Sequence, residues 1–349
     1  MDDTRAPIVL LVDDPPINVS YYLRKQQSDL GILPPSRGDF SKFLDRWREM
    51  EKSRIVPNAF WTKFIEWAQA AGVKGKFTLL PCPAGLGSLD DHVEGYSERE
   101  LSDLIELVRV EYTKSFDITP EILTHTLAWN IETRKLLPVT EHEWMARQDG
   151  ETLAAYMAEG LRILRNVGIV APGITQPCSF SGDERVYARA VLEAEKRVND
   201  IRHTYYFLNT DPDSAPVPSP VMIADKEYDE FVVSVVSASK ADEPFWATIY
   251  GDGDVGPMAD YYLSEDGLKG RFVDLLAAGG PIVFHAHSQT LYSNGTEKGF
   301  TALREVVKRV QQHIGDRVQW MKIGEFAARA HFTPTEGAGA GSGAVKCAG

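Results

Sequence analysis

Short apolar runs alternate with amphipathic stretches from one end of the chain to the other. The runs have the length of strands, whereas the amphipathic stretches repeat apolar residues every three or four positions, which predicts helices packed on a core. Strands are expected at 8–12, 76–80, 121–129, 169–170, 204–208, 231–236, 245–250 and 281–284. Helices are expected to begin near residues 58, 97, 153, 186, 268 and 300. Such alternation is typical of parallel strands connected by helices.

Capping residues mark several of the expected helix ends. Asn58 is expected to cap a helix that Gly72 ends, because an asparagine side chain accepts from free amides and a glycine adopts the left-handed conformation. Ser97 and Glu100 have the spacing of a capping box. Gly168 follows the third helix at the position where a left-handed residue ends it.

The order of elements predicts an α/β fold. Six or seven strand–helix units suit either a (β/α) barrel or a doubly wound sheet. In both architectures, functional side chains gather at the carboxyl ends of the strands. Residues 1–335 are expected to form a single domain, and the Gly/Ala-rich segment 336–349 is expected to be a disordered tail.

Composition narrows the class of protein. The 349 residues include 37 Lys and Arg against 50 Asp and Glu, a net charge of -13, which argues against a nucleic-acid partner. No apolar stretch approaches the roughly 20 residues of a membrane span, and the N-terminal apolar run is too short for a signal peptide. The three cysteines form no Cys-x-x-Cys pattern. A soluble cytoplasmic protein is therefore expected, with its oligomeric state left open.

The candidate chemistry lies where expected strands end. Asp13 and Asp14 directly follow the first strand, and His285 and His287 lie on one face of the last, because strand side chains alternate. His125 falls in the expected third strand. Carboxylates and imidazoles at the mouths of buried strands are suitable ligands for a divalent metal, and a metal makes hydrolysis plausible.

Each of these residues also has a purely structural explanation. Asp14 is able to cap a helix that begins at the following prolines, and a single buried His125 is more often a hydrogen-bonded core residue. Two buried imidazoles on one strand face are harder to explain in this way, since both need polar partners. The run Asp252-Gly253-Asp254 suggests a calcium ligand set but is equally typical of a turn.

With these positions in hand, the chain resembles the polysaccharide deacetylases of the NodB homology family. Leu11-Val12-Asp13-Asp14 resembles the first family motif and Glu121-Ile122-Leu123-Thr124-His125-Thr126 the second, and Gly72 to Thr78 is similar to the segment that enters the second strand. Towards the C-terminus, the resemblance extends through His287-Ser288-Gln289, Gly295, Trp320 and Glu325-Phe326-Ala327. The resemblance implies an irregular (β/α) barrel of about seven parallel strands.

The resemblance also implies roles for individual residues. Asp13 would be the catalytic base, and Asp14, His125 and His287 would bind a divalent metal, expected to be Zn²⁺. His285 is the alternative third ligand, and whichever of the two histidines is not a ligand would act as the acid. Substrate contacts are expected from Trp129, Thr175 and Pro177.

Two departures from the family pattern leave the function open. The family carries a second histidine four residues after the first in its second motif, where this chain has Trp129, and its Arg-x-Pro motif is replaced by Gly173 to Pro177 without the arginine. The leading expectation is a metal-dependent hydrolase of an amide or ester acyl bond in a carbohydrate or small molecule. A glycoside hydrolase, or a non-catalytic carbohydrate-binding protein, is the alternative.

Overall fold

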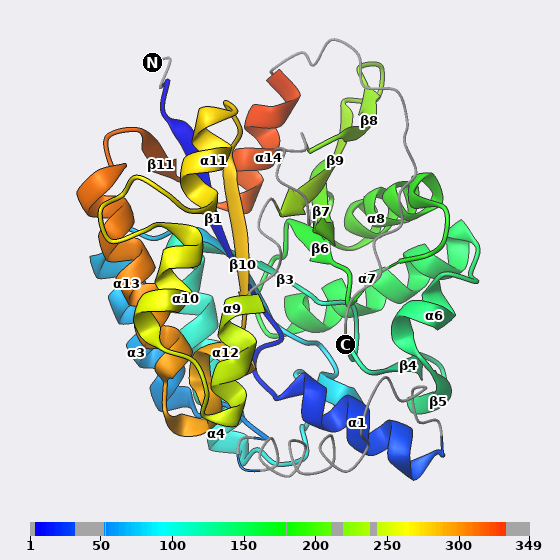
Figure 1. Ribbon diagram of the computed structural model, residues 1–349. Coiled ribbons are helices and arrows are strands. Elements are labelled where there is room, and N and C mark those ends of the chain that lie inside the picture. Colours follow the sequence, from blue (N-terminus) through cyan, green and yellow to red (C-terminus); the bar gives the residue numbers. More distant parts are fainter. Residues whose placement is uncertain are drawn as a thin grey trace.

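The computed structural model describes residues 4–31, 52, 54–178, 180–210, 219–237 and 243–332, without the side chains of 209, 210, 243 and 330–332. The expected tail at 336–349 lies outside these ranges. Figure 1 shows β1 (Ala6–Asp13), β10 (Ile282–His287) and β7 (His203–Thr210) in the middle of the molecule. Helices α3 (Asn58–Ala70), α10 (Val255–Tyr262) and α13 (Lys298–His313) lie on one side, and α6 (Glu141–Met145), α7 (Gly150–Asn166) and α8 (Glu184–Asn199) on the other.

A five-stranded parallel sheet forms one half of the strand layer. Its order is β10-β1-β2-β3, and β11 also pairs with β1. The strands are β1 (Ala6–Asp13), β2 (Gly75–Thr78), β3 (Phe116–Thr119), β10 (Ile282–His287) and β11 (Val318–Trp320). Residues Ile8 to Val12 of β1 are fully buried, as the apolar run predicts for a strand with both faces covered.

A second sheet has the order β6-β7-β9-β8, in which only β8 is antiparallel to its neighbour. Its strands are β6 (Gly173–Thr175), β7 (His203–Thr210), β8 (Val221–Asp225) and β9 (Glu230–Ser237). A separate antiparallel hairpin consists of β4 (Leu127–Asn130) and β5 (Lys135–Thr140).

The two sheets share an interior and touch at both margins. An apolar cluster contains Val9 and Val283 from the first sheet together with Phe207 and Val233 from the second, and Phe326 of α14 (Ile323–Phe332) joins it. At one margin, Glu121 and Thr175 form an isolated parallel bridge. At the other margin, Ser237 Oγ donates to Val283 O at 3.1 Å. Among the described residues, backbone pairing thus gives two larger sheets and one two-stranded hairpin, and does not by itself close a seven-stranded barrel.

Helices connect most of the strands. They are α1 (Val19–Asp29), α3 (Asn58–Ala70), α4 (Glu98–Leu107), α5 (Thr113–Ser115), α6 (Glu141–Met145), α7 (Gly150–Asn166), α8 (Glu184–Asn199), α9 (Glu243–Trp246), α10 (Val255–Tyr262), α11 (Arg271–Ala277), α12 (Ser288–Tyr292) and α13 (Lys298–His313). Short 3-10 turns lie at η2 (Pro83–Gly85), η4 (Ala247–Tyr250) and η5 (Ser293–Gly295), and a π-helical turn at η3 (Val108–Tyr112). No helix in the described part of the chain is long and apolar enough to cross a membrane.

The capping box is confirmed, whereas the expected cap at Asn58 is wrong. Ser97 Oγ accepts from the Glu100 amide, and the Glu100 carboxylate accepts from the Ser97 amide at 3.0 Å. Asn58 is the first residue of α3, and Pro57 occupies the cap position. The Asn58 side chain instead donates to Glu100 O at 2.7 Å, so that it joins α3 to α4.

Three expected strands are wrong. Residues 169–170 are not a strand, and the strand in that part of the chain is β6 at Gly173–Thr175. The third strand is not 121–129: β3 ends at Thr119, because Pro120 lacks an amide hydrogen for the ladder. Residues 120–126 form a loop, and 127–129 belong to β4 of the antiparallel hairpin. The segment 245–250 is helical, in α9 and η4. Trp246, Ile249 and Tyr250 have helical spacing and pack with Tyr21 of α1, so a tertiary contact outweighs the strand propensity of aromatic and branched residues.

Candidate metal centre

Asp13 and Asp14 lie where buried strand β1 ends. Asp14 has a left-handed backbone with φ of 74°, which turns the chain sharply after the strand. Such a conformation costs a non-glycine residue about 1–2 kcal/mol, although aspartate tolerates it better than most. The Asp14 side chain is only 2% exposed. A buried carboxylate on a strained turn is a feature that proteins often retain for function.

The loop after β3 brings two further polar groups to Asp14. Glu121 Oε1 lies 2.9 Å from His125 Nε2, and Asp14 Oδ1 lies 3.1 Å from the same nitrogen. Glu121 Oε2 accepts from the Asp14 amide at 2.9 Å, which leaves Oε1 directed at the histidine. One donor atom from each of the three side chains lies within 4.8 Å of the others, and this is the grouping suited to hold a metal ion.

Glu141 of α6 holds the loop in place. Its Oε1 accepts from the Leu123 and Thr124 amides, each at 3.0 Å, and its Oε2 accepts from the His125 amide at 2.7 Å. Tyr156 of α7 donates its hydroxyl proton to Glu141 Oε1 at 2.6 Å. Because Glu141 is fully buried and charge-assisted bonds are strong, it fixes a loop in which His125 has a left-handed φ of 63°.

Burial and charge act against each other on the three groups. Burial raises the pKa of Asp14, but the nearby His125 and His287 outweigh burial and lower that pKa to about 2. Burial lowers the pKa of His125, whereas Glu121 and Asp14 together raise that pKa well above its usual value. Burial raises the pKa of Glu121. Without a metal, a protonated imidazole therefore lies between two carboxylates, and a bound cation would take over the role of that proton.

A bound cation would balance the buried charges next to the cluster. Asp13 forms a buried ion pair with Lys76 of β2, whose side chain has no exposed surface. Lys76 also donates to Thr175 Oγ1 at 2.8 Å. Asp14 and Glu121 then carry two further negative charges beside a histidine that is neutral when it binds a metal. A divalent cation compensates these two charges, as buried carboxylates require. Asp14 Oδ1 is buried and makes no hydrogen bond of normal geometry, which also fits a ligand atom.

The two histidines of β10 border the cluster without joining it. His287 is the register partner of Asp13, and its ring lies 5.1 Å from that of Trp246. His285 is buried, with its Nδ1 3.0 Å from Ser237 Oγ. Their ring centres are 5.4 Å apart. In the described structure, the group of three converging side chains contains Glu121 and does not include His287, which was expected as a metal ligand.

The expected substrate contacts have varied surroundings. Trp129 is 8% exposed and packs in the main hydrophobic core, with its amide donating to the Tyr156 hydroxyl. Thr175 supports the site indirectly through Lys76, and its hydroxyl also lies 2.9 Å from that of Thr119. Pro177 is buried, and its carbonyl accepts from Gln176. Thr175 thus contacts Lys76, the partner of Asp13, and Trp129 contacts Tyr156, which donates to Glu141.

Three residues of the site were missed by reasoning from sequence. Lys76 is a charged residue inside an otherwise apolar strand, which is a signal that such a strand needs a buried partner charge. Glu121 lies four residues before His125, a spacing available in the sequence. No sequence pattern indicated Glu141, because its contacts with residues 123–125 depend on how the β4–β5 hairpin between them folds.

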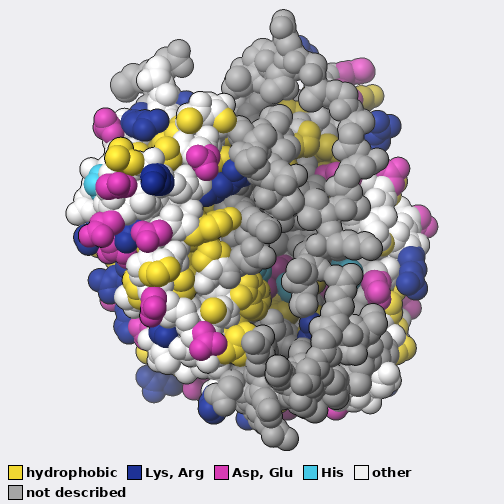
Figure 2. Space-filling view, in the orientation of Figure 1, with side chains coloured by type: hydrophobic (Ala, Val, Ile, Leu, Met, Phe, Trp, Pro, Cys, Tyr) yellow, Lys and Arg dark blue, Asp and Glu magenta, His cyan; other side chains and the backbone are white. Residues whose placement is uncertain are grey.

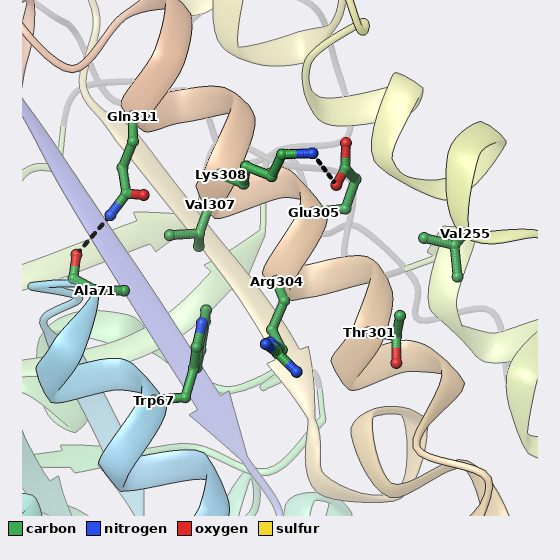
Figure 3. Close-up of a pocket in the computed structure, with 9 residues that line it drawn as sticks. All are labelled: Trp67, Ala71, Val255, Thr301, Arg304, Glu305, Val307, Lys308 and Gln311. Carbon is green, nitrogen blue, oxygen red and sulfur yellow. Dashed lines mark hydrogen bonds and ion pairs between the residues drawn. The ribbon is translucent and has the colours of Figure 1, made fainter.

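A surface pocket of about 400 Å³ lies elsewhere, between α3, α10 and α13. Figure 3 shows Trp67, Arg304 and Gln311 around it, with Gln311 donating to Ala71 O at 3.0 Å. It shares no residue with the metal cluster, so its position does not bear on the chemistry there. Figure 2 shows histidine side chains in the middle of one face, with hydrophobic side chains beside them.

Comparison with known proteins adds no relative to this description. No protein-family model matches the chain, and no curated protein is significantly similar to it. Function therefore has to be argued from the geometry of the site.

Proposed function

We propose that this protein is a metal-dependent hydrolase of an amide or ester acyl bond, similar to the polysaccharide deacetylases. The observation that carries the proposal is the convergence of Asp14, Glu121 and His125 in a buried group, directly beside an Asp13 that is paired with Lys76. Metal ligands next to a separate ionised carboxylate are the parts that such hydrolysis requires.

The proposal includes a different alignment of the second family motif. If His125 is the later member of the motif, the earlier member is Glu121, at the same spacing of four residues. The ligand group then has three members, and Trp129 no longer marks a missing one. The burial of Trp129 in the core supports this alignment, because a core residue needs no role at the site.

The proposed fold is the irregular (β/α) barrel of that family. Support comes from the shared interior of the two sheets, from the bridge between Glu121 and Thr175, and from the bond between Ser237 and Val283 at the opposite margin. In such a barrel the metal ligands lie at the carboxyl ends of the strands, where the loops after β1 and β3 carry them.

The residues of the chain divide the chemistry among them. A divalent cation held by Asp14, Glu121 and His125 would supply Lewis-acid polarisation of the scissile carbonyl and make a water more acidic. Asp13 accepts a proton from the attacking water, and Lys76 keeps that carboxylate oriented. His287, opposite Asp13 in the β1–β10 register, donates a proton to the leaving group. Trp246 beside His287 offers an aromatic surface to a carbohydrate or another small substrate.

The alternative functions have less support. A glycoside hydrolase needs two carboxylates about 5–9 Å apart on either side of the bond. A second carboxylate from Asp252 or Asp254 has no support, because both residues are exposed and are absent from the cluster. A non-catalytic carbohydrate-binding protein was favoured mainly by Trp129, which is buried in the core.

Metal content and hydrolysis measured together test the proposal. Wild type is expected to bind about one divalent ion per chain and to release acetate from acetylated sugars or small amides, whereas Asp14→Ala and His125→Ala lose both properties. His203→Ala is the control, because that histidine pairs with Asp229 on the surface and its side chain is 58% exposed. A wild type that binds no metal after reconstitution, or a loaded enzyme that hydrolyses none of these substrates, would contradict the proposal.

A further inference from the structure

We propose that Glu121 adapts the site to a hard, six-coordinate divalent cation of the Mn²⁺ type, in place of the zinc that two imidazole ligands would favour. The inference rests on the proposed metal site and goes further, because it names the class of cation and the residue that selects it.

The first argument is the set of ligand atoms. Asp14 and Glu121 each offer a carboxylate oxygen, and His125 is the single nitrogen ligand in the group. Carboxylates suit hard cations such as Mg²⁺ and Mn²⁺, whereas imidazoles favour zinc and the later transition metals. The expectation of zinc depended on His287 as a second imidazole, and His287 does not belong to the converging group.

The second argument is the separation of the ligand atoms. Ligands that are neighbours in an octahedron with bonds of about 2.1 Å lie about 3.0 Å apart, whereas those of a zinc tetrahedron lie about 3.3–3.4 Å apart. His125 Nε2 lies 2.9 Å from Glu121 Oε1 and 3.1 Å from Asp14 Oδ1. Both distances match the octahedral spacing. They also match an imidazolium bonded to two carboxylates, and metal binding distinguishes these two states.

The third argument is that the oxygen ligands are already oriented. The Asp14 amide holds Glu121 Oε2 at 2.9 Å, so Oε1 alone faces the centre of the group. Asp14 Oδ1 is buried and makes no hydrogen bond of normal geometry. Glu121 therefore presents a single oxygen, and Asp14 Oδ1 is a second buried oxygen beside it, which suits a cation that takes single oxygen ligands and completes its shell with water.

Relative metal affinity is the appropriate measurement. Zinc binds most nitrogen and oxygen sites more tightly than manganese does, so the ratio of the two dissociation constants is the informative quantity. Mn²⁺ binding is followed by the loss of the electron paramagnetic resonance signal of the free ion, and Zn²⁺ binding by competition with a chelating dye. The proteins are wild type, Glu121→His, the isosteric Glu121→Gln, and Glu195→Gln as a control. Glu195 is another fully buried glutamate, bonded to Asn199 and absent from the cluster.

The expected results are specific to Glu121. Glu121→His raises the preference for Zn²⁺ over Mn²⁺ by at least about tenfold, and Glu121→Gln weakens Mn²⁺ binding by at least about tenfold. Glu195→Gln changes neither quantity. Because Glu121→Gln keeps the shape of the side chain, it tests the inference even if Glu121→His does not fold.

The outcomes separate this inference from the proposed function. If wild type binds metal but Glu121→His leaves the ratio unchanged, or Glu121→Gln binds Mn²⁺ as wild type does, the inference is overturned while the proposed function stands. If wild type binds neither ion, the proposed site is itself wrong and the inference falls with it. Metal binding with the expected ratios but without hydrolysis supports the inference and contradicts the proposed function.

Discussion

The ion pair between Lys76 and Asp13 provides a direct test of how the buried charges are balanced. Replacing Lys76 by methionine keeps most of the unbranched side chain and removes the ammonium group. The variant leaves Asp13 as a buried carboxylate without its partner. It also removes the bond to Thr175 and the contact between the ammonium and the Phe207 ring, whose centre is 4.9 Å away.

The expected loss of stability is large because neither partner is solvated. The side chain of Lys76 is 0% exposed and that of Asp13 is 5% exposed. Removing one member of such a pair typically costs about 3–5 kcal/mol, since the other charge remains buried. Removing both charges costs much less, because no uncompensated charge remains. The double variant Lys76→Met with Asp13→Asn is therefore expected to lose less free energy of unfolding than the two single variants lose in total, by at least about 2 kcal/mol.

Urea unfolding of the metal-free protein measures these differences without a contribution from bound metal. Lys63→Met serves as a matched control, because Lys63 pairs with Glu297 at 2.7 Å on the surface, where the lysine side chain is 55% exposed. That control is expected to lose less than about 1 kcal/mol. The reasoning is refuted if Lys76→Met costs no more than Lys63→Met, or if the two single effects simply add in the double variant.

Two further substitutions test buried glutamates that differ in function. Glu141→Gln places an amide group against the backbone amides of residues 123–125 and is expected to weaken metal binding by about 10- to 100-fold, measured by titration, while Glu195→Gln leaves metal binding unchanged. Equal affinities in these two variants would show that Glu141 only stabilises the fold. Burial raises the pKa of Glu195 from 4.5 to about 8. Between these two pH values the folded state keeps a proton on Glu195 that the unfolded chain releases, so the free energy of unfolding falls as the pH rises from 4.5 to about 8. Glu195→Gln is therefore expected to gain stability relative to wild type between pH 5 and 8, by up to on the order of 4 kcal/mol, and a difference that stays flat with pH in unfolding experiments would contradict this.

The regular part of the fold follows from local patterns. Strands β1 and β10 and the capping box at Ser97 were predictable because apolar runs and capping side chains act within a few residues. The segment 245–250 was not, because its aromatic and branched residues favour a strand locally while contacts with Tyr21 of α1 favour a helix. Strand propensity depends on neighbouring residues in the sequence and does not include the contact with Tyr21, which is distant in the chain.

The candidate site was only partly predictable for the same reason. Asp13, Asp14 and His125 were found because they stand beside recognisable strands or motifs. Glu121 was overlooked because the loop after β3 was mistaken for a strand, which would have separated Glu121 from His125 along the sheet. A loop with a left-handed His125 brings both side chains to Asp14 instead, and that loop depends on Glu141.

The bridge between Glu121 and Thr175 joins the two ends of a long segment of the chain. After β3 ends at Thr119, the chain passes through Glu121, forms the β4–β5 hairpin, α6 and α7, and returns at β6, where Thr175 pairs with Glu121. Because the start of the segment 121–175 carries Glu121 and His125, a ligand bound to them and to Asp14 would join this segment to the end of β1. Amide hydrogen exchange along the margin between the two sheets would consequently register occupancy of the site from residues that never touch the ligand.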